Sequence, residues 1–287
     1  MLPAGAGSSE GIDTQIGRID VDAVDLFFFR QDRDGTGRSV DAALRFAQNV
    51  NVVGGRAIRL ACSPDGARIE LEDGSIKYDM ITGIGINFFG HSHPEMMRAA
   101  LSATAADIYQ GNLEPGTEVA ELLRALLSRV EPSSRLRKGW ITTCGTMANE
   151  IALKIIRQKK TPASKIIAFR DCFAGRSTAM QEITDNPKYR EGQPVYGEVY
   201  YVPFYDPALG LEASTRATIH ALEDHLQRYP GKFAGLMLEL VQGEGGFNFA
   251  PREYYVAVFE AAKKAGLAIW ADEIQSFGRT GQRPGVH

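Results

Sequence analysis

The feature that most constrains the fold is a regular alternation of apolar strand-like runs and amphipathic helical segments from Trp140 onward. The strand candidates are short and apolar, whereas the helix candidates repeat their apolar residues at helical spacing. Such alternation predicts an α/β protein with a mostly parallel sheet covered by helices on both faces. The predicted strands are Trp140–Thr143, Ile166–Phe169, Val199–Phe204, Phe233–Val241 and Leu267–Ala271, and the predicted helices are Ala148–Lys159, Ser214–Tyr229 and Arg252–Ala265.

The sequence before Trp140 predicts a different organisation. Residues 1–40 are rich in Gly, Asp and Ser and predict an N-terminal arm. From Ile58 an apolar/polar alternation, interrupted by turn formers at Pro64–Gly66 and Asp73–Gly74, predicts a small antiparallel sheet. Two helices are predicted to follow, from Pro94 through Ala106 and over Gly116–Val130.

Charge and cysteine content narrow the possible partners. The 35 acidic and 32 basic residues give a net charge of -3 without a basic block, which argues against nucleic acid and anionic membranes as partners. Three widely spaced cysteines fit neither a disulfide framework nor a zinc site and favour a reducing cytoplasm. We expect no signal peptide and no membrane span, because no suitable apolar run occurs.

Two motifs resemble known sites but lack required parts. The pair His91-x-His93 has no third or fourth ligand nearby in sequence, so we predict structural hydrogen bonding and no metal site. The pair Gly83-x-Gly85 lacks the third glycine of a dinucleotide fingerprint, since Phe88 takes that position. A Rossmann-type nucleotide binder would need that fingerprint after a strand, and the sequence does not supply it.

Polar residues follow several predicted strands at what should be one edge of the sheet. Gly145 opens a helix whose first N–H groups can bind an anion, although an ordinary helix start has the same sequence. Phe173 follows the second strand, Glu239 and a glycine-rich turn end the fourth, and Asp272 follows the fifth. An anion cradle, an aromatic plate and carboxylates at one edge suit a planar, phosphorylated nitrogen heterocycle. Pyridoxal 5'-phosphate fits this description, with Asp272 keeping the ring nitrogen protonated.

The sequence resembles the class III aminotransferases, members of the fold-type I pyridoxal-phosphate group that includes acetylornithine, ornithine and 4-aminobutyrate aminotransferases. The resemblance runs from about Ile58 to Gly281 and rests on motifs in the family's order, namely GIGINFFGHSHPE, CGTMANEIALK, FAGRS, LELVQGEGG and ADEIQSFGRTG. It implies a three-layer large domain with a mostly parallel sheet, incomplete here, over residues 96–287, and an N-terminal segment of the small domain over residues 41–95. It also implies a homodimer that transfers an amino group from an amino acid or ω-amine donor to a 2-oxo acid.

The resemblance further implies a set of cofactor-binding residues. These are Gly145 and Thr146 at the phosphate through backbone N–H groups, Phe173 stacked on the pyridine ring, Glu239 as support, Asp272 at the ring nitrogen and Gln275 at the ring hydroxyl. Glu244 matches a glutamate that in some members pairs with a substrate-contacting arginine. The chain departs from the family pattern at Met147, Ala174, Leu240 and the shortened segment Ser276–Gly278, which affects substrate choice more than cofactor binding.

The family's catalytic lysine, which holds the cofactor and moves the proton, lies well beyond the aspartate and has no match before His287. We therefore expect the chain as given to be inactive by itself, and we identify no catalytic residue in it. Lysines on the predicted helices are expected to be solvated, namely Lys154, Lys159, Lys263 and Lys264. Two alternatives stay open: a non-catalytic pyridoxal-phosphate-binding or dimer-partner protein, and an aminomutase or decarboxylase of the same fold.

Overall fold

The computed structural model describes residues 58–59, 66–71, 75–106, 116–134 and 136–279. The chain divides into two compact units, Met1–Ser102 and Ala103–His287. Several predictions concern segments wholly or partly outside the described residues: the N-terminal arm (1–40), the start of the small-domain segment (41–57), most of the first turn (64–65), the turn at 73–74 and the tail from 280 to 287.

The first unit contains a three-stranded antiparallel sheet in the order β1-β2-β3, with strands Ile58–Arg59, Arg68–Leu71 and Ile76–Tyr78. The alternation in the sequence predicts this pairing, and the register confirms it. A short helix, α2 (Thr82–Gly85), follows, and α3 (Pro94–Ala105) begins at the proline that predicts its start. The predicted boundary after Glu95 lies within α3, so the assignment of these parts to a small and a large domain stays a prediction.

His91 in this unit has a structural role. Its side chain is buried, and its Nε2 lies 2.6 Å from Oδ2 of Asp79. The other oxygen of Asp79 accepts hydrogen bonds from the backbone N–H groups of Ile81 and Thr82. Within the described residues no group of three or more His, Cys, Asp and Glu could hold a metal ion. The prediction of structural hydrogen bonding is confirmed for His91, whereas Nδ1 of His93 is buried without a hydrogen-bond partner among the described residues.

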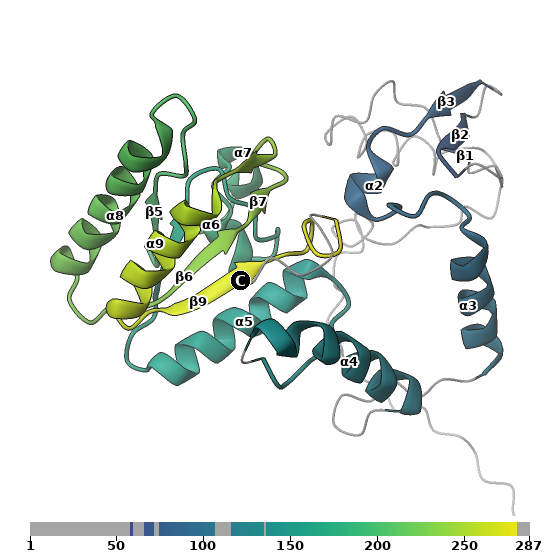
Figure 1. Ribbon diagram of the computed structural model, residues 1–287, viewed down its shortest axis with the longest axis horizontal. Helices are drawn as coiled ribbons and strands as arrows, with labels where there is room; N and C mark the ends of the chain where they lie inside the picture. Colours follow the sequence, from purple (N-terminus) through teal and green to yellow (C-terminus); the bar gives the residue numbers. More distant parts are fainter. Residues whose placement is uncertain (1–57, 60–65, 72–74, 107–115, 135, 280–287) are drawn as a thin grey trace, which may run out of the picture. The chain divides into compact units, whose positions relative to one another are not determined.

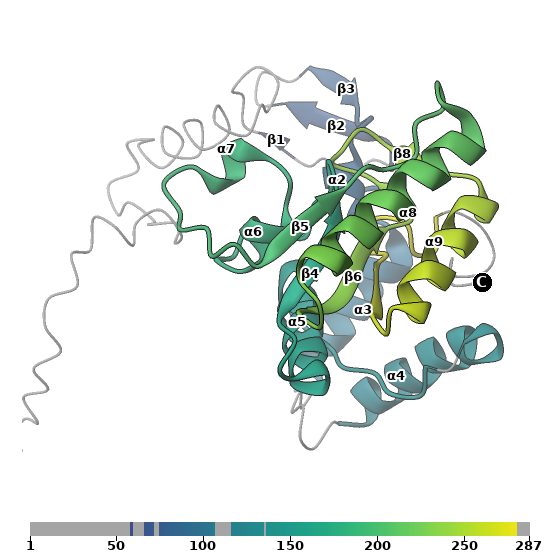
Figure 2. The same cartoon turned by 90° about the vertical axis from the view of Figure 1, so that its left-hand side faces the viewer.

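The second unit is built on a parallel sheet, which has four strands in the described part of the chain, in the order β5-β4-β6-β9 (Figures 1 and 2). These strands are Val199–Val202, Lys165–Phe169, Phe233–Glu239 and Ala268–Asp272. A small antiparallel pair follows β6, formed by β7 (Val241–Gln242) and β8 (Asn248–Phe249). The helices are α4 (Thr117–Val130), η2 (Glu131–Ser133), α5 (Gly145–Lys160), α6 (Met180–Ile183), α7 (Pro187–Arg190), α8 (Gly210–Arg228) and α9 (Arg252–Lys264).

Helices cover both faces of the sheet because its strands are apolar on both sides. Within β4, Ile166 and Ala168 pack in one core cluster with α5 and α6. Ile167 and Phe169 pack in a second cluster with α8 and α9, which lie side by side (Figure 2). Successive side chains of a strand point to opposite faces, so one short strand serves both cores. The predicted three-layer arrangement is confirmed.

Two predicted strands differ from the structure. Trp140–Thr143 is not a strand: Trp140 is exposed, and no described strand of the sheet pairs with this segment. The predicted strand Phe233–Val241 ends at Glu239, and Val241 starts the antiparallel pair β7–β8 instead. Apolar runs alone do not reveal whether a neighbouring strand offers backbone partners, which explains both errors.

None of the described helices combines the length and the apolar character that a segment crossing a bilayer requires.

Candidate functional site

Two carboxylates end neighbouring strands at the same edge of the parallel sheet. Glu239 is the last residue of β6 and Asp272 the last of β9, and the two are paired in the sheet register. Met237 and Trp270, two residues earlier in each strand, pack in the core cluster beneath α5. Because residues i and i+2 share a face, both carboxylates lie on the α5 side of the sheet.

Asp272 is buried and is held by two donors. Its Oδ2 accepts a hydrogen bond of 2.6 Å from Nδ2 of Asn149 on α5, and its Oδ1 accepts one of 3.0 Å from the N–H of Ile274. Burial raises the pKa of Asp272, and the bonds from Ile274 and Asn149 oppose that rise. No described cation lies within ion-pair distance of this carboxylate. The residue is therefore a buried acid whose ionised form a bound cation would stabilise.

Glu239 is the second buried acid. Its Oε1 accepts a hydrogen bond of 2.8 Å from the N–H of Phe173. Burial raises the pKa of Glu239 to about 8, and the nearby charge of Asp272 contributes to that rise. At neutral pH the pair therefore carries less than its formal charge of two, since Glu239 retains a proton much of the time. A cation placed between the two acids would favour ionisation of both.

The first turn of α5 lies against the same edge. The helix begins at Gly145 after Cys144, which makes no side-chain capping bond, and its first turn contains no acidic residue. A Cβ on Gly145 would lie 2.8 Å from Cγ1 of Ile274, and a Cβ on Gly175 would lie 2.5 Å from Oγ1 of Thr146. Both glycines allow the loops after β4 and β9 to approach the helix start closely. Uncapped N–H groups and the positive helix end make this turn suitable for an anion.

Phe173 lies in the loop after β4 and is half-buried. Its ring meets the ring of Tyr189 edge to face, with 5.7 Å between the centroids and 73° between the planes. The hydroxyl of Tyr189 donates a hydrogen bond of 2.6 Å to Oε1 of Glu244. Phe173 and Glu244, both predicted from the sequence, are therefore connected through Tyr189 on α7, which sequence reasoning did not identify.

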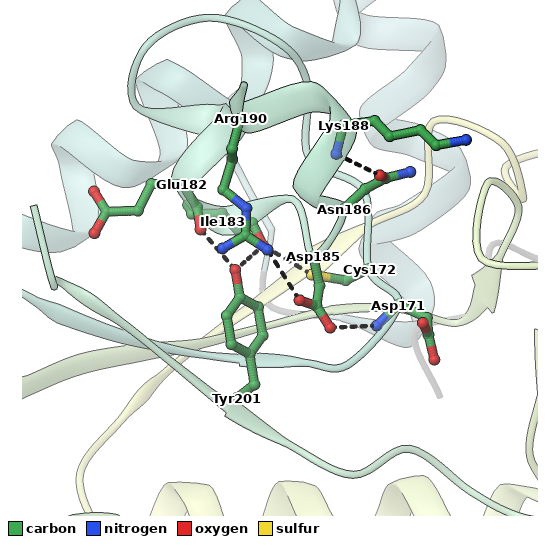
Figure 3. A network of polar contacts seen from close by, with 9 residues as sticks. All are labelled: Asp171, Cys172, Glu182, Ile183, Asp185, Asn186, Lys188, Arg190 and Tyr201. Carbon is green, nitrogen blue, oxygen red and sulfur yellow. Dashed lines mark hydrogen bonds and ion pairs between the residues drawn. The ribbon is translucent and has the colours of Figure 1, made fainter. Parts of the chain in front are cut away.

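The loop that carries Phe173 is held by the polar network in Figure 3. The N–H of Asp171 donates to Oδ2 of Asp185 at 3.0 Å, and Asp185 also pairs with Arg190 at 3.2 Å. The Sγ of Cys172 donates to the carbonyl of Ile183 at 3.1 Å. These bonds fix the loop against α6 and α7, so the position of Phe173 depends on contacts that are distant in sequence.

Thr184, just after α6, fixes the following residues. Its Oγ1 accepts hydrogen bonds from the N–H groups of Ala174 and Gly175 and donates one to the carbonyl of Gly175. One buried hydroxyl thus satisfies three backbone groups of the loop that contacts the start of α5.

Gln275 completes the predicted set. Its side chain lies against Gly243 in the loop after β6, where a Cβ on the glycine would overlap the Gln275 carboxamide. The structure therefore places Gly145, Thr146, Phe173, Glu239, Asp272 and Gln275 around the same edge of the sheet. Their individual roles toward a ligand stay predictions.

Sequence reasoning missed Asn149, which the structure places at the centre of the site. Asn149 shares the buried face of α5 with Leu153 and Ile156. A polar residue in such an apolar stripe is the signal that could have indicated it, because a buried amide requires partners. Tyr189 and Thr184 carry no comparable signal.

Other features of this unit lie outside the site. The lysines predicted to be solvated are exposed, namely Lys154, Lys159, Lys263 and Lys264. A cavity of about 590 Å³ lies along α8 and is lined by residues that include Arg216, His220 and Glu253. Its walls belong to the helices on the opposite face of the sheet from α5, so it is separate from the paired carboxylates.

Replacing Gly175 by alanine should destabilise the protein. The glycine has a φ of 133°, and the new methyl group would collide with the side chain of Thr146. We expect a loss of roughly 2 kcal/mol or more in the free energy of unfolding, measured in urea. Gly192→Ala is the matched control, because Gly192 also has a positive φ but no atom lies within 4 Å of the place that its Cβ would take. Equal losses in the two variants would contradict close packing of Gly175 on Thr146.

Comparison with known protein families gives an independent result. Residues 54–285 match the family model described as Aminotransferase class-III. A probable mitochondrial acetylornithine aminotransferase from Schizosaccharomyces pombe is 31% identical over 232 residues, which cover 77% of this chain and 49% of that protein. An acetylornithine aminotransferase from Mycolicibacterium smegmatis is 34% identical over 224 residues, which cover 76% of this chain and 52% of that protein. The chain spans about half the length of these curated relatives.

Solved structures show the same fold at lower identity. The (S)-enantioselective omega-transaminase from Thermomicrobium roseum superposes with a TM-score of 0.73 at 21% identity, covering 90% of this chain and 57% of that chain. The taurine:2-oxoglutarate aminotransferase from Bifidobacterium kashiwanohense, solved with PLP and glutamate, gives a TM-score of 0.69 at 20% identity and covers 77% and 51%. The fold class predicted from the sequence is confirmed.

Proposed function

This chain belongs to the class III aminotransferase family, and on that premise we propose that it binds pyridoxal phosphate at the carboxyl edge of its parallel sheet. We further propose that the protein transfers an amino group from an amino acid or ω-amine donor to a 2-oxo acid. The observation that carries this proposal is the convergence of an uncapped helix start and two buried carboxylates at one edge.

The residues fit this cofactor in charge and in shape. Its phosphate is an anion, and the start of α5 offers N–H groups without a competing carboxylate in the first turn. The absence of side chains at Gly145 and Gly175 lets Ile274 and Thr146 pack closely there, which brings the loops after β9 and β4 to the start of α5. Its protonated ring is a cation, and Asp272 is a buried carboxylate without a described cationic partner.

Each residue of the site has a definable task. Pyridoxal phosphate, when bound, supplies an electron-withdrawing ring that eases removal of a proton next to an amine. Asp272 would hold the proton on the ring nitrogen, and Glu239 would support the edge while fixing the Phe173 backbone. The Phe173 ring would stack on the heterocycle, and the Gln275 amide would donate to the ring hydroxyl. Gly145 and Thr146 would bind the phosphate through their N–H groups.

Support for the substrates comes from family membership and from relatives that are named acetylornithine aminotransferases. Glu244, exposed beside the Phe173 plate, is a candidate contact for a substrate group or its partner side chain. The predicted inactivity of the chain as given, and the choice between transaminase, aminomutase and decarboxylase, stay predictions.

We also propose a homodimer, which sedimentation velocity can test. Large apolar side chains are exposed near the start of α5 and on α4, namely Leu122, Leu126, Trp140 and Met147, and such patches favour protein contacts.

The predicted cytoplasmic location is supported by the free thiols of Cys144 and Cys172. Fractionation of the host cells is the measurement that tests it.

The cofactor proposal predicts that the phosphate contributes strongly to binding. The chain should retain pyridoxal phosphate during gel filtration, whereas pyridoxal, which lacks the phosphate, should bind at least roughly tenfold more weakly by equilibrium dialysis. Inorganic phosphate should compete with the cofactor, because it would occupy the start of α5. Equal affinity for pyridoxal and pyridoxal phosphate would contradict the assignment of that helix start to the phosphate.

A further inference from the structure

Asn149 is the residue that joins the separate parts of the site. It lies in the second turn of α5, and only 5% of the residue is exposed. Its Nδ2 donates to Oδ2 of Asp272 at 2.6 Å and to the carbonyl of Ala174 at 2.9 Å. Its Oδ1 accepts from Nε1 of Trp270 at 3.1 Å. One amide thus contacts two residues of β9 and the loop after β4.

The chemistry of these partners fixes the orientation of the amide. A backbone carbonyl and a carboxylate can only accept hydrogen bonds, whereas the indole N–H of Trp270 can only donate. Exchanging the nitrogen and oxygen of Asn149 would therefore break all three bonds. Both N–H bonds of the amide are used, so the side chain has one satisfied arrangement and no freedom to rotate away from Asp272.

This arrangement acts on the charge and direction of Asp272. Burial raises the pKa of Asp272, and the hydrogen bond that Asn149 donates opposes that rise because it stabilises the ionised carboxylate. The second donor, the N–H of Ile274, holds the other carboxylate oxygen from the turn after β9. With both oxygens held, the free lone pairs of Asp272 keep a fixed direction in the site.

We propose that Asn149 is a positioning residue that keeps Asp272 ionised and aimed at the ring nitrogen of the cofactor, an inference that rests on the proposed function. Asn149 would act through the Asp272 carboxylate, to which its Nδ2 donates a hydrogen bond of 2.6 Å. The side chain therefore belongs to the chemistry of the site as well as to the packing of α5.

The first test uses the 287-residue chain without cofactor, so it does not depend on pyridoxal phosphate binding. The ionisation of Asp272 is followed by carbon NMR of labelled aspartate, with the signal assigned by its loss in Asp272→Asn. In Asn149→Leu, which has a similar size but no donor, the ionisation constant should fall roughly ten- to hundredfold. Asn149→Ser, which keeps a donor, should fall between this variant and the wild type.

Thr218→Val is the matched control for loss of a buried polar group. Thr218 is fully buried and bonds to Tyr254 on the α8 and α9 side of the sheet. This variant should leave the ionisation of Asp272 unchanged. An equal change in Asn149→Leu and Thr218→Val, or no change in either, would overturn the proposal. If Asn149→Leu does not fold, the test uses the wild-type protein. The NMR signal of the Asn149 side-chain amide should then shift over the same pH range in which Asp272 titrates. An amide signal that does not change as Asp272 titrates would overturn the proposal.

The second test uses pyridoxal phosphate labelled with nitrogen-15 in the ring. The ring nitrogen should be protonated in the wild type. It should lose that proton at a lower pH in Asn149→Leu, because a less readily ionised Asp272 stabilises the ring cation less. If the ring nitrogen lost its proton at the same pH in both proteins, the proposal that Asn149 affects the cofactor through Asp272 would be overturned. Absence of cofactor binding in the wild type would contradict the proposed function, and the cofactor-free titration would still decide whether Asn149 controls Asp272.

Discussion

Replacing Asp272 by alanine is expected to weaken pyridoxal phosphate binding roughly ten- to hundredfold, as measured by equilibrium dialysis. The carboxylate is buried at the end of β9, and no described cation neutralises it. A protonated ring nitrogen would gain a charge-assisted hydrogen bond there, and alanine removes that bond. Asp272→Asn should bind more tightly than Asp272→Ala but should leave the ring nitrogen unprotonated, because an amide carries no charge.

The matched control is Asp206→Ala. Asp206 follows β5 at the same edge of the sheet, but it is exposed, and its carboxylate accepts a bond from the N–H of Ala208. Cofactor affinity should be unchanged in this variant. Wild-type affinity in Asp272→Ala, or equal losses in the two alanine variants, would contradict the assignment of Asp272 to the ring nitrogen.

Replacing Glu239 by glutamine is expected to remove most of the stability loss that the cofactor-free protein undergoes between pH 5 and pH 8. Burial raises the pKa of Glu239 from 4.5 to about 8, so the folded protein keeps a proton that the unfolded chain releases. The stability that this proton contributes is fully present below pH 4.5 and is lost as the pH rises through 8. Glutamine cannot ionise, and its oxygen can still accept the bond from the Phe173 N–H.

The size of the effect follows from the pKa difference. Between pH 5 and pH 8 the wild type should lose roughly 3 to 4 kcal/mol from this group, whereas Glu239→Gln should not. Urea unfolding at both pH values measures the difference between the two proteins. Glu212→Gln, at a side chain that is 89% exposed, controls for the chemical change itself. If the free energy of unfolding changed equally with pH in the wild type and in Glu239→Gln, that result would contradict a buried, protonated Glu239.

Bound cofactor should lower the raised pKa values of the two carboxylates. A positive ring near Asp272 and Glu239 would favour their ionised forms, so binding should release protons near neutral pH. The same two carboxylates therefore link the pH dependence of stability to the proposed function.

Local sequence determined most of the second unit. The strands β4, β5 and β9 and the helices α8 and α9 were predictable within a few residues, because apolar periodicity and helix start and stop residues are local signals. The position of Asp272 at the end of β9 followed from the same pattern. Trp140–Thr143 has the composition of a strand, but a strand also needs a neighbour, and that is not a property of the segment itself.

The sequence by itself determined the α/β class and the strand ends at which the polar residues gather, because both depend on residue type and on periodicity along the chain. Only the tertiary structure decided that Asn149 bonds to Asp272, 123 positions away, and that Tyr189 connects the Phe173 ring to Glu244. It alone also decided that Glu239 keeps a proton near neutral pH. Hydrogen bonds and desolvation depend on distances across the fold, and no local pattern encodes them.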